Sequence, residues 1–181
     1  MKIGIDISQI VYEGTGVAEY TRRLVEQLLR VDNKNEYVLF FSNHRVKMTN
    51  DKCQMTNQIN NSKFQIKSFR IPIAFLEFMW NRLHIFPIEW LIGKVDVFFT
   101  SDWVEPPTIR AKKITTVHDL SVLKVPETFD QKIVEVHKRK LQWVVKESAK
   151  ILCDSYATRQ DIMKLLGVEE SRLTVVYPGI D

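Results

Sequence analysis

The sequence is poor in the residues that define several classes of protein. It has only two cysteines, Cys53 and Cys153, and they do not have metal-ligand spacing. We expect Cys153, at the end of an apolar run, to be a buried free thiol, and the compartment to be reducing and cytoplasmic. No Asp-x-Asp pair of the kind that holds a metal ion occurs in the sequence. We therefore expect no metal site.

Long apolar runs are also missing. No stretch approaches the roughly 20 apolar residues of a membrane span. The first residues follow a strand pattern, so we expect no signal peptide, which would need a basic start and an apolar core. The sequence has no internal repeat and no low-complexity tract. We expect one large domain over residues 1–181, long enough to bury a sizeable core.

Charge of the two signs is nearly balanced. The 26 Lys and Arg residues against 22 Asp and Glu give a net charge of +4. This charge suits anionic ligands or acidic lipid without identifying either, and no pattern indicates a nucleic-acid partner. Between His44 and Arg70 the only carboxylate is Asp51, and a solvated basic loop is the simpler interpretation of that segment. Its six cations are Arg45, Lys47, Lys52, Lys63, Lys67 and Arg70.

Short apolar strands alternate with helical patterns along the chain. Most of the strands are near-continuous apolar runs, which is typical of a parallel sheet covered on both faces. We predict an α/β fold with an open, doubly wound, Rossmann-like parallel sheet. The predicted strands are 2–8, 36–41, 64–69, 95–100, 113–117, 149–153 and 173–177. The predicted helices are 17–30, 128–150, 155–166 and an apolar segment over 73–92 that Pro87 breaks.

A glycine turn, Tyr12-Glu13-Gly14-Thr15-Gly16, joins the first strand to the first helix. Such a turn can bring backbone N–H groups and a helix N-terminus to a phosphate. It lacks the third glycine of the dinucleotide fingerprint and the Lys-Ser/Thr of a P-loop. A tight β-to-α connection without a ligand explains the glycines equally well. Helical spacing predicts that the buried side of the helix is Val17, Tyr20, Leu24, Leu28 and Val31.

Polar residues follow four of the predicted strands, at the edge where ligands bind in doubly wound sheets. His118-Asp119 is the sharpest pair, because an imidazole can hydrogen-bond a sugar hydroxyl or, when protonated, a phosphate. A turn that merely ends the strand is the competing interpretation. The full set is Tyr12, Gly14, Gly16, Ser101, Asp102, Trp103, His118, Asp119, Asp154 and Ser155. We expect His44, His84 and His137 to be structural.

The apolar segment from Phe75 to Trp90 allows two interpretations. Its aromatic and aliphatic side chains, with Arg82 and Lys94 at the edge, could rest on a membrane as a peripheral contact. Core packing of a helix that covers the sheet is the favoured interpretation.

Five motifs, in order along the chain, resemble the N-terminal domain of GT-B fold glycosyltransferases in glycosyltransferase family 4 (group 1), most closely its mannosyltransferase-like members. The first is the glycine loop and helix, and the third contains His118-Asp119-Leu120. The five segments are Gly14 to Leu24, Trp80 to Phe98, Thr116 to Phe129, Asp154 to Ile162 and Val175 to Asp181.

The resemblance implies transfer of a sugar from a UDP- or GDP-sugar donor to a saccharide or lipid-linked acceptor, with retention at the anomeric carbon. It also implies a second, C-terminal lobe that carries most of the donor site, including a Glu-x7-Glu motif. We expect that lobe to lie outside this chain, and the present lobe alone to be inactive. Glu127 and Glu135 have the motif's spacing, but they lie in the wrong lobe and we interpret the match as chance.

The resemblance also implies roles for individual residues. Gly14, Thr15 and Gly16 would face the donor phosphates, and His118 would contact the transferred sugar or the acceptor. Asp119 would orient His118 or bind a hydroxyl. The acceptor side would be lined by Tyr12, Ser101 and Asp102.

Two other functions stay open at this point. The chain could be a non-catalytic, single-lobe subunit that binds an acceptor or assembles with a partner chain. It could also be a nucleotide-binding α/β protein outside glycosyl transfer. An open reading frame that continues for about another domain's length beyond Asp181 would favour the enzyme.

Overall fold

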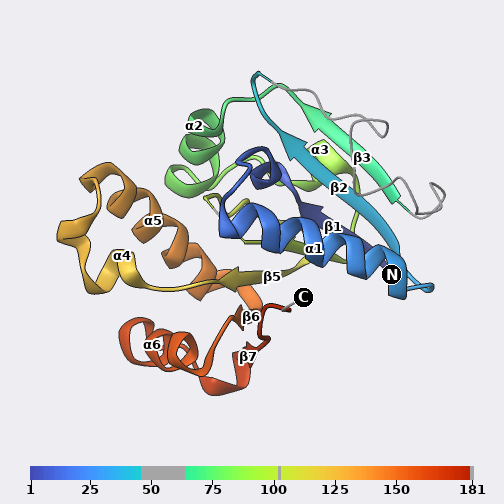
Figure 1. The fold of residues 1–181 in the computed structure, drawn as a ribbon. Coiled ribbons are helices and arrows are strands. Elements are labelled where there is room, and N and C mark those ends of the chain that lie inside the picture. The colour runs from blue at the N-terminus through green and yellow to red at the C-terminus, as the bar shows by residue number, and fades with distance from the viewer. Residues whose placement is uncertain (46–63, 102, 180–181) are drawn as a thin grey trace.

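The strands form one twisted parallel sheet (Figure 1). The computed structural model describes residues 1–45, 64–101 and 103–179. In these residues the sheet has seven strands, all parallel, in the order β3-β2-β1-β4-β5-β6-β7. The predicted α/β fold is thus confirmed. The strands are β1 (Lys2–Asp6), β2 (Glu36–Ser42), β3 (Phe64–Phe69), β4 (Val97–Thr100), β5 (Lys112–Val117), β6 (Ser148–Cys153) and β7 (Leu173–Val175).

The strand order reverses between β1 and β4. From β1 the chain winds outward to β3, crosses back to β4, and then winds outward again to β7. The connections that leave β1 and β4 therefore diverge, which opens a crevice at the carboxyl edge of the sheet. In Figure 1 the arrowheads of β2 and β5 point to the left, toward this edge, where α1 (Gly16–Val31) begins.

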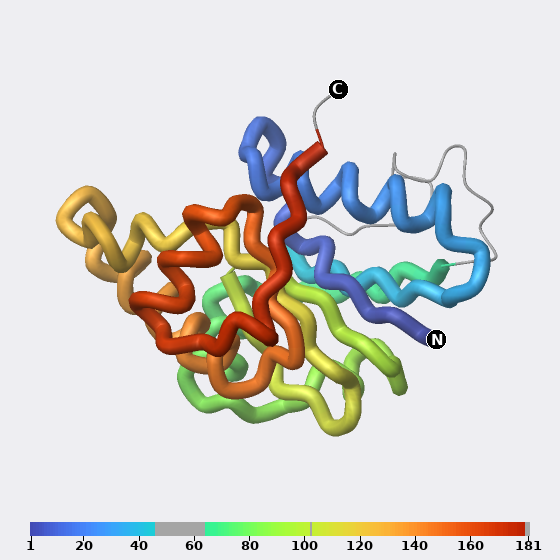
Figure 2. The backbone as a smooth tube through the Cα atoms, turned by 90° about the horizontal axis from the view of Figure 1, so that it is seen from below, coloured from blue at the N-terminus to red at the C-terminus, as the bar shows by residue number. Residues whose placement is uncertain are grey.

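Helices cover both faces of the sheet. Helix α1 lies on one face, and the segment from α2 (Ile73–Leu76) to α3 (Glu89–Ile92) lies on the opposite face (Figure 2). Between α2 and α3 the chain forms the π-helix η4 (Glu77–Arg82), against which α5 (Gln131–Glu147) packs. The remaining helices are η1 (Ser8–Val11), α4 (Ser121–Lys124), η5 (Pro126–Thr128), α6 (Tyr156–Leu166) and η6 (Glu170–Arg172).

The predicted buried side of α1 was wrong by about one residue. The fully buried residues are Ala18, Thr21, Val25 and Leu29, whereas Val31 is 69% exposed. Tyr20, Leu24 and Leu28 flank this stripe and are only partly buried. The small Ala18 and Thr21 lie on the buried side of the helix, and their burial does not follow from the positions of the large apolar residues.

Two helix ends follow their predicted signals. The side chain of Ser155 accepts a hydrogen bond from the backbone N–H of Thr158 at 3.1 Å, which caps the start of α6. Gly167 ends α6 in the left-handed conformation, with φ of 65°. Helix α5 is shorter than predicted, because residues from Ser148 onward pair with β5 and leave the helix.

The segment over 73–92 is broken ahead of Pro87, as predicted, into helical pieces. Its inner residues Leu76, Trp80, Ile88 and Ile92 are buried, which confirms the expectation of core packing for these four. Its other large apolar residues stay in contact with solvent: Phe75, Phe78, Leu83, Ile85, Phe86 and Trp90. None of the helices in the described part of the chain combines the length and the apolar character needed to cross a membrane.

Cys153 is a buried free thiol, as predicted, and burial raises its pKa to about 11. Cys53 lies outside the described residues.

A buried ionic cluster lies between the sheet and α5. The Lys113 side chain is 2% exposed, and its Nζ lies 3.4 Å from Oε1 of Glu105 and 2.7 Å from Oε2 of Glu147. Glu105 is fully buried and also accepts hydrogen bonds from the hydroxyls of Thr100 and Thr115. Each charge in this cluster has an opposite charge and polar neighbours, which offsets the cost of removing it from water.

Replacing Glu105 by Ala is expected to lower the free energy of unfolding by about 3–5 kcal/mol, because Lys113 loses its most buried partner. Chemical denaturation of the purified chain measures this loss. The control is Glu127→Ala on the exposed η5, which should change stability by no more than about 0.5 kcal/mol. Equal stability of the two variants would show that the cluster contributes little.

Candidate functional site

A pocket lies at the point where the strand order reverses. It has a volume of about 160 Å³ and is lined by residues that follow the carboxyl ends of four strands. After β1 these are Ser8, Gln9 and Tyr12, next to Asp6 at the strand's end. The others are Ser42, Asn43, His44 and Arg45 at the end of β2, Ile73 at the start of α2, and Trp103 and Val104 after β4.

Buried hydrogen bonds fix the floor of this pocket. Nε2 of Gln9 donates to Oγ of Ser101 at 2.6 Å, and Ser101 shares a second hydrogen bond with Thr21 of α1 at 3.3 Å. The Ser101 hydroxyl is therefore used in hydrogen bonds beneath the pocket, and Ser101 does not line the pocket. The predicted acceptor-side residue Asp102 lies outside the described residues.

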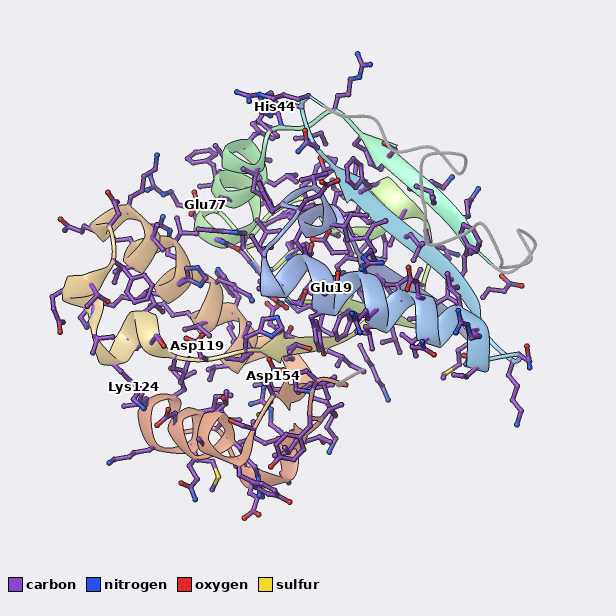
Figure 3. The ribbon with its side chains drawn as sticks, viewed as in Figure 1. Glu19, His44, Glu77, Asp119, Lys124 and Asp154 are labelled. Carbon is purple, nitrogen blue, oxygen red and sulfur yellow. The ribbon has the colours of Figure 1, made fainter. Side chains whose placement is uncertain are left out.

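The rim of the pocket combines aromatic rings with cationic groups. Tyr12, predicted on the acceptor side, lines the pocket and is 44% exposed. His44 also lines it, and its Nε2 accepts a hydrogen bond from Nε of Arg45 at 3.1 Å. His44, expected to be structural, thus lies at the rim of the pocket. Figure 3 shows its position at the end of β2. Polar groups beside aromatic rings suit a polar ligand that also has apolar faces, as a sugar ring has.

The glycine loop directly follows Tyr12. Gly14 has φ of 82°, a conformation that favours glycine, and Thr15 caps α1 by accepting a hydrogen bond from the N–H of Ala18 at 3.3 Å. Gly16 has no such backbone requirement, and a Cβ added there would meet no atom within 4 Å. Neither backbone conformation nor packing requires glycine at position 16, which leaves room for a close approach of a ligand to the start of α1.

His118 follows β5 and is paired with Asp154, which follows β6. Nδ1 of His118 lies 2.6 Å from Oδ2 of Asp154. The carboxylate accepts a hydrogen bond from Nδ1–H of the ring, and in that tautomer Nε2 is a hydrogen-bond acceptor. Nε2 is buried, and no described residue offers it a hydrogen bond. Figure 3 shows Asp154 beyond the end of β5, on the same edge of the sheet as Asp119.

Asp119 does not contact the His118 ring in the way its adjacent position suggested. Its Oδ1 accepts a hydrogen bond from the backbone N–H of Ser121 at 2.7 Å. The carboxylate that orients the imidazole is that of Asp154, so the predicted orienting role of Asp119 needs correction. Asp119 is exposed at this edge of the sheet.

Helix α1 connects the two parts of the site. The Tyr20 hydroxyl shares a hydrogen bond with Thr116 at 3.1 Å, and the Tyr20 ring packs edge-on against His118 with ring centroids 4.9 Å apart. One turn earlier, α1 begins at the glycine loop beside the pocket. The pocket, the loop and His118 thus lie along one edge of the sheet.

His137 of α5 stands behind the pocket wall. Its ring lies 4.9 Å from that of Trp103. Burial lowers the pKa of His137 to about 4, the nearby charge of Lys140 acts in the same direction, and Asp119 opposes it. His137 is therefore neutral at physiological pH, which agrees with the structural role expected for it.

Sequence reasoning missed the residues after β2 and the pairing of His118 with Asp154. Only the strand order reveals that β2 ends beside the crevice. Asp154 was recognised as a residue at a strand end, but its partner is 36 positions away. In the described stretches, no group of three or more His, Cys, Asp or Glu side chains is placed to hold a metal ion.

Comparison with known proteins gives one family. The model of the family described as Glycosyltransferase Family 4 matches residues 14–181, which is almost the whole chain. No curated protein matches the sequence. The matched region includes the glycine loop, most of the pocket and the His118–Asp154 pair.

The low pKa of His137 predicts a contribution to the pH dependence of stability. Between pH 6.5 and about 4 the unfolded chain binds a proton at this residue and the folded chain does not, so acid favours unfolding. His137→Gln should therefore lose less stability than the wild type as the pH falls through this range. Denaturation at several pH values measures both slopes, and Lys138→Gln, one residue further along α5, should keep the wild-type slope. Identical slopes for the wild type and His137→Gln would contradict the prediction.

Proposed function

Because the chain belongs to glycosyltransferase family 4, we propose that it is the acceptor-side lobe of an enzyme that transfers a sugar from a nucleotide-sugar. Glycosyl transfer requires a donor and an acceptor. One observation carries the finer assignment. Three features occur together along one edge of the sheet. They are the pocket, the helix N-terminus with open space at Gly16, and the imidazole of His118 with an unpartnered ring nitrogen.

The acceptor binds in the pocket between β1 and β4. Gln9, Ser8 and Asn43 offer hydrogen-bonding groups, and Tyr12 and Trp103 offer aromatic faces. A saccharide, or the saccharide-like head of a lipid-linked acceptor, has the alternating polar and apolar surfaces that such a lining fits. Arg45 at the rim would attract a negative charge on the acceptor.

The diphosphate of the donor, a UDP- or GDP-sugar, lies against the glycine loop. The first backbone N–H groups of α1 are not all used inside the helix, and the helix dipole favours an anion at this end. The absence of a side chain at Gly16 lets phosphate oxygens approach that backbone. The same groups would stabilise the negative charge that develops on the leaving diphosphate during transfer.

His118 contacts the transferred sugar through Nε2, and Asp154 positions it. The hydrogen bond to Asp154 selects the ring tautomer and fixes the ring plane, so the free nitrogen is presented in one direction. Nε2 then accepts a hydrogen bond from a sugar hydroxyl. This contact orients the anomeric carbon between the acceptor and the leaving group, and transfer proceeds with retention of configuration.

A second lobe completes the site. The family resemblance assigns the base and ribose contacts to a C-terminal lobe. Closure of the two lobes would bring donor and acceptor together and exclude water from the reacting atoms.

His118→Ala in the full-length enzyme should lower kcat by about 10²-fold, the usual effect of removing one positioned polar group. Release of UDP or GDP from a panel of nucleotide-sugars in the presence of acceptor measures this change. Asp154→Asn should lower kcat less while moving the proton between the ring nitrogens of His118, which NMR of the ¹⁵N-labelled ring detects. Unchanged turnover in His118→Ala would remove this residue from the site, and a collapsed thermal melt would show that its role is structural.

Gly16→Ala should raise the KM for the nucleotide-sugar by about tenfold, because the methyl group occupies the space left for phosphate. Its stability should not fall, since alanine is a better helix residue than glycine. Gly14→Ala is the comparison, because its positive φ should cost about 1–2 kcal/mol of stability. A normal KM in Gly16→Ala would mean that the phosphates bind elsewhere.

A further inference from the structure

The segment from α2 to α3 carries six large apolar side chains that are exposed to solvent. We call it the apolar stripe, and its members come from α2, η4, the following loop and α3. Their exposed fractions range from 36% for Phe86 to 65% for Trp90. The other four members of the stripe are Phe75, Phe78, Leu83 and Ile85. Phe86 and Trp90 pack edge-on with ring centroids 5.2 Å apart, and exposed apolar side chains that gather on a folded protein indicate an interaction surface.

The negative charges of this segment are used internally. Glu77 forms an ion pair with Arg139 of α5 at 2.9 Å. Oε1 of Glu89 accepts hydrogen bonds from three successive backbone N–H groups, those of residues 109–111, at 2.8–3.2 Å. The charge of Glu77 is therefore neutralised, and that of Glu89 is held by backbone donors beside α3.

The positive charges of the same segment are not neutralised. Arg82 and Lys94 are exposed, and within the described residues neither forms an ion pair. The guanidinium of Arg82 lies 6.0 Å from the ring centre of Phe78, a member of the stripe. Arg110, beside α3, is also exposed. The stripe is thus an apolar surface with unpaired cations at its margin.

The loop that carries Leu83, Ile85 and Phe86 is held in an unusual conformation. His84 and Phe86 both have positive φ, 52° and 72°, which is unfavourable for side chains of this size. The loop is held from beneath, because the His84 ring stacks on Trp143 and bonds to Glu147, and Trp80 donates to the Phe86 carbonyl. The apolar side chains are therefore kept at the surface by buried contacts.

We propose that the apolar stripe docks the protein on a membrane surface that contains anionic lipid. Aromatic and aliphatic side chains enter the boundary between headgroups and acyl chains, and cations at the margin meet the negative headgroups. Two cations of this segment, Arg82 and Lys94, remain unpaired against the single unpaired carboxylate of Glu89, and this net positive charge fits the uniform negative charge of a lipid surface. The docking requires no sugar or nucleotide, so it stands or fails independently of the proposed transfer reaction.

The stripe begins at the rim of the pocket. Ile73, the first residue of α2, lines the pocket, and Phe75 of the stripe follows two positions later. Figures 1 and 3 show α2 and Glu77 near the carboxyl edge of the sheet, where His44 also lies. Docking through the stripe would bring the pocket close to the lipid surface.

Co-sedimentation of the 181-residue chain with vesicles tests the proposal. The chain should sediment with an equimolar mixture of phosphatidylglycerol and phosphatidylcholine, sediment much less with phosphatidylcholine alone, and be released by salt. Removing two marginal cations in Arg82→Gln/Lys94→Gln should weaken binding to the anionic vesicles by about tenfold or more. Arg30→Gln/Lys34→Gln, at the end of α1 on the opposite face, should bind as the wild type does.

A matched pair of leucines tests the apolar part. Leu83 in the stripe and Leu165 in α6 are both 46% exposed. Leu83→Ser should weaken vesicle binding by about fivefold, whereas Leu165→Ser should not change it. Equal effects of the two substitutions, or equal sedimentation with both kinds of vesicle, would overturn the proposal. A dimer in sedimentation velocity that Leu83→Ser abolishes would instead assign the stripe to a second copy of the chain.

Discussion

The buried residue Glu105 ties the connection that leaves β4 to the strands beneath it and to η4. Its carboxylate is bonded by groups of β4 and β5, and its backbone N–H donates to Asn81 of η4, at the point where the strand order reverses. A carboxylate without these partners would be too costly to bury. Because they converge on one group, the connection has a single low-energy position. That position places Trp103 in the wall of the pocket.

The same cluster extends to the surface that carries the apolar stripe. The Asn81 side chain accepts from the backbone N–H of Glu105 at 2.9 Å and donates to the carbonyl of Trp103 at 2.8 Å. Glu147 bonds both to Lys113 and to His84, which carries the strained loop. Polar networks of this kind are rigid when every member is satisfied. The pocket wall and the apolar stripe are thus held by one buried framework, although they face different surroundings.

The sequence predicted what depends on local pattern. Apolar strands, the Ser155 cap and the Gly167 stop appear where their chemistry indicated, and so does the helix break ahead of Pro87. The errors concern properties set by packing. The buried side of α1 includes the small Ala18 and Thr21 rather than the large apolar residues, and α5 ends early because Ser148 joins the sheet.

The candidate site was predicted in position but not in its partnerships. Strand ends identified His118 and the glycine loop, because the edge that binds ligands follows from the fold class alone. The neighbour in sequence, Asp119, was assigned the orienting role that belongs to Asp154. Adjacent residues after a strand tend to point in different directions, whereas residues that end neighbouring strands are brought together by the sheet. Pairing of β5 with β6 places Val117 opposite Cys153, and the next residue of each strand is His118 or Asp154. The contact between His118 and Asp154 therefore follows from the strand register. It can be predicted from the sequence once the order of the strands is known.

Helix α1 connects the parts of the site, since it contacts each of them through a different residue. Its start faces the glycine loop, Tyr20 packs on His118, and Thr21 bonds to Ser101 beneath the pocket. Tyr20 and Thr21 are consecutive, so they point to different sides of the helix and reach the two parts of the site from one turn. A shift of α1 along the sheet would move the glycine loop, the imidazole contact and the pocket floor together. The buried Ala18, Thr21, Val25 and Leu29 fix the position of α1 against the sheet, and the geometry of the site follows from that packing.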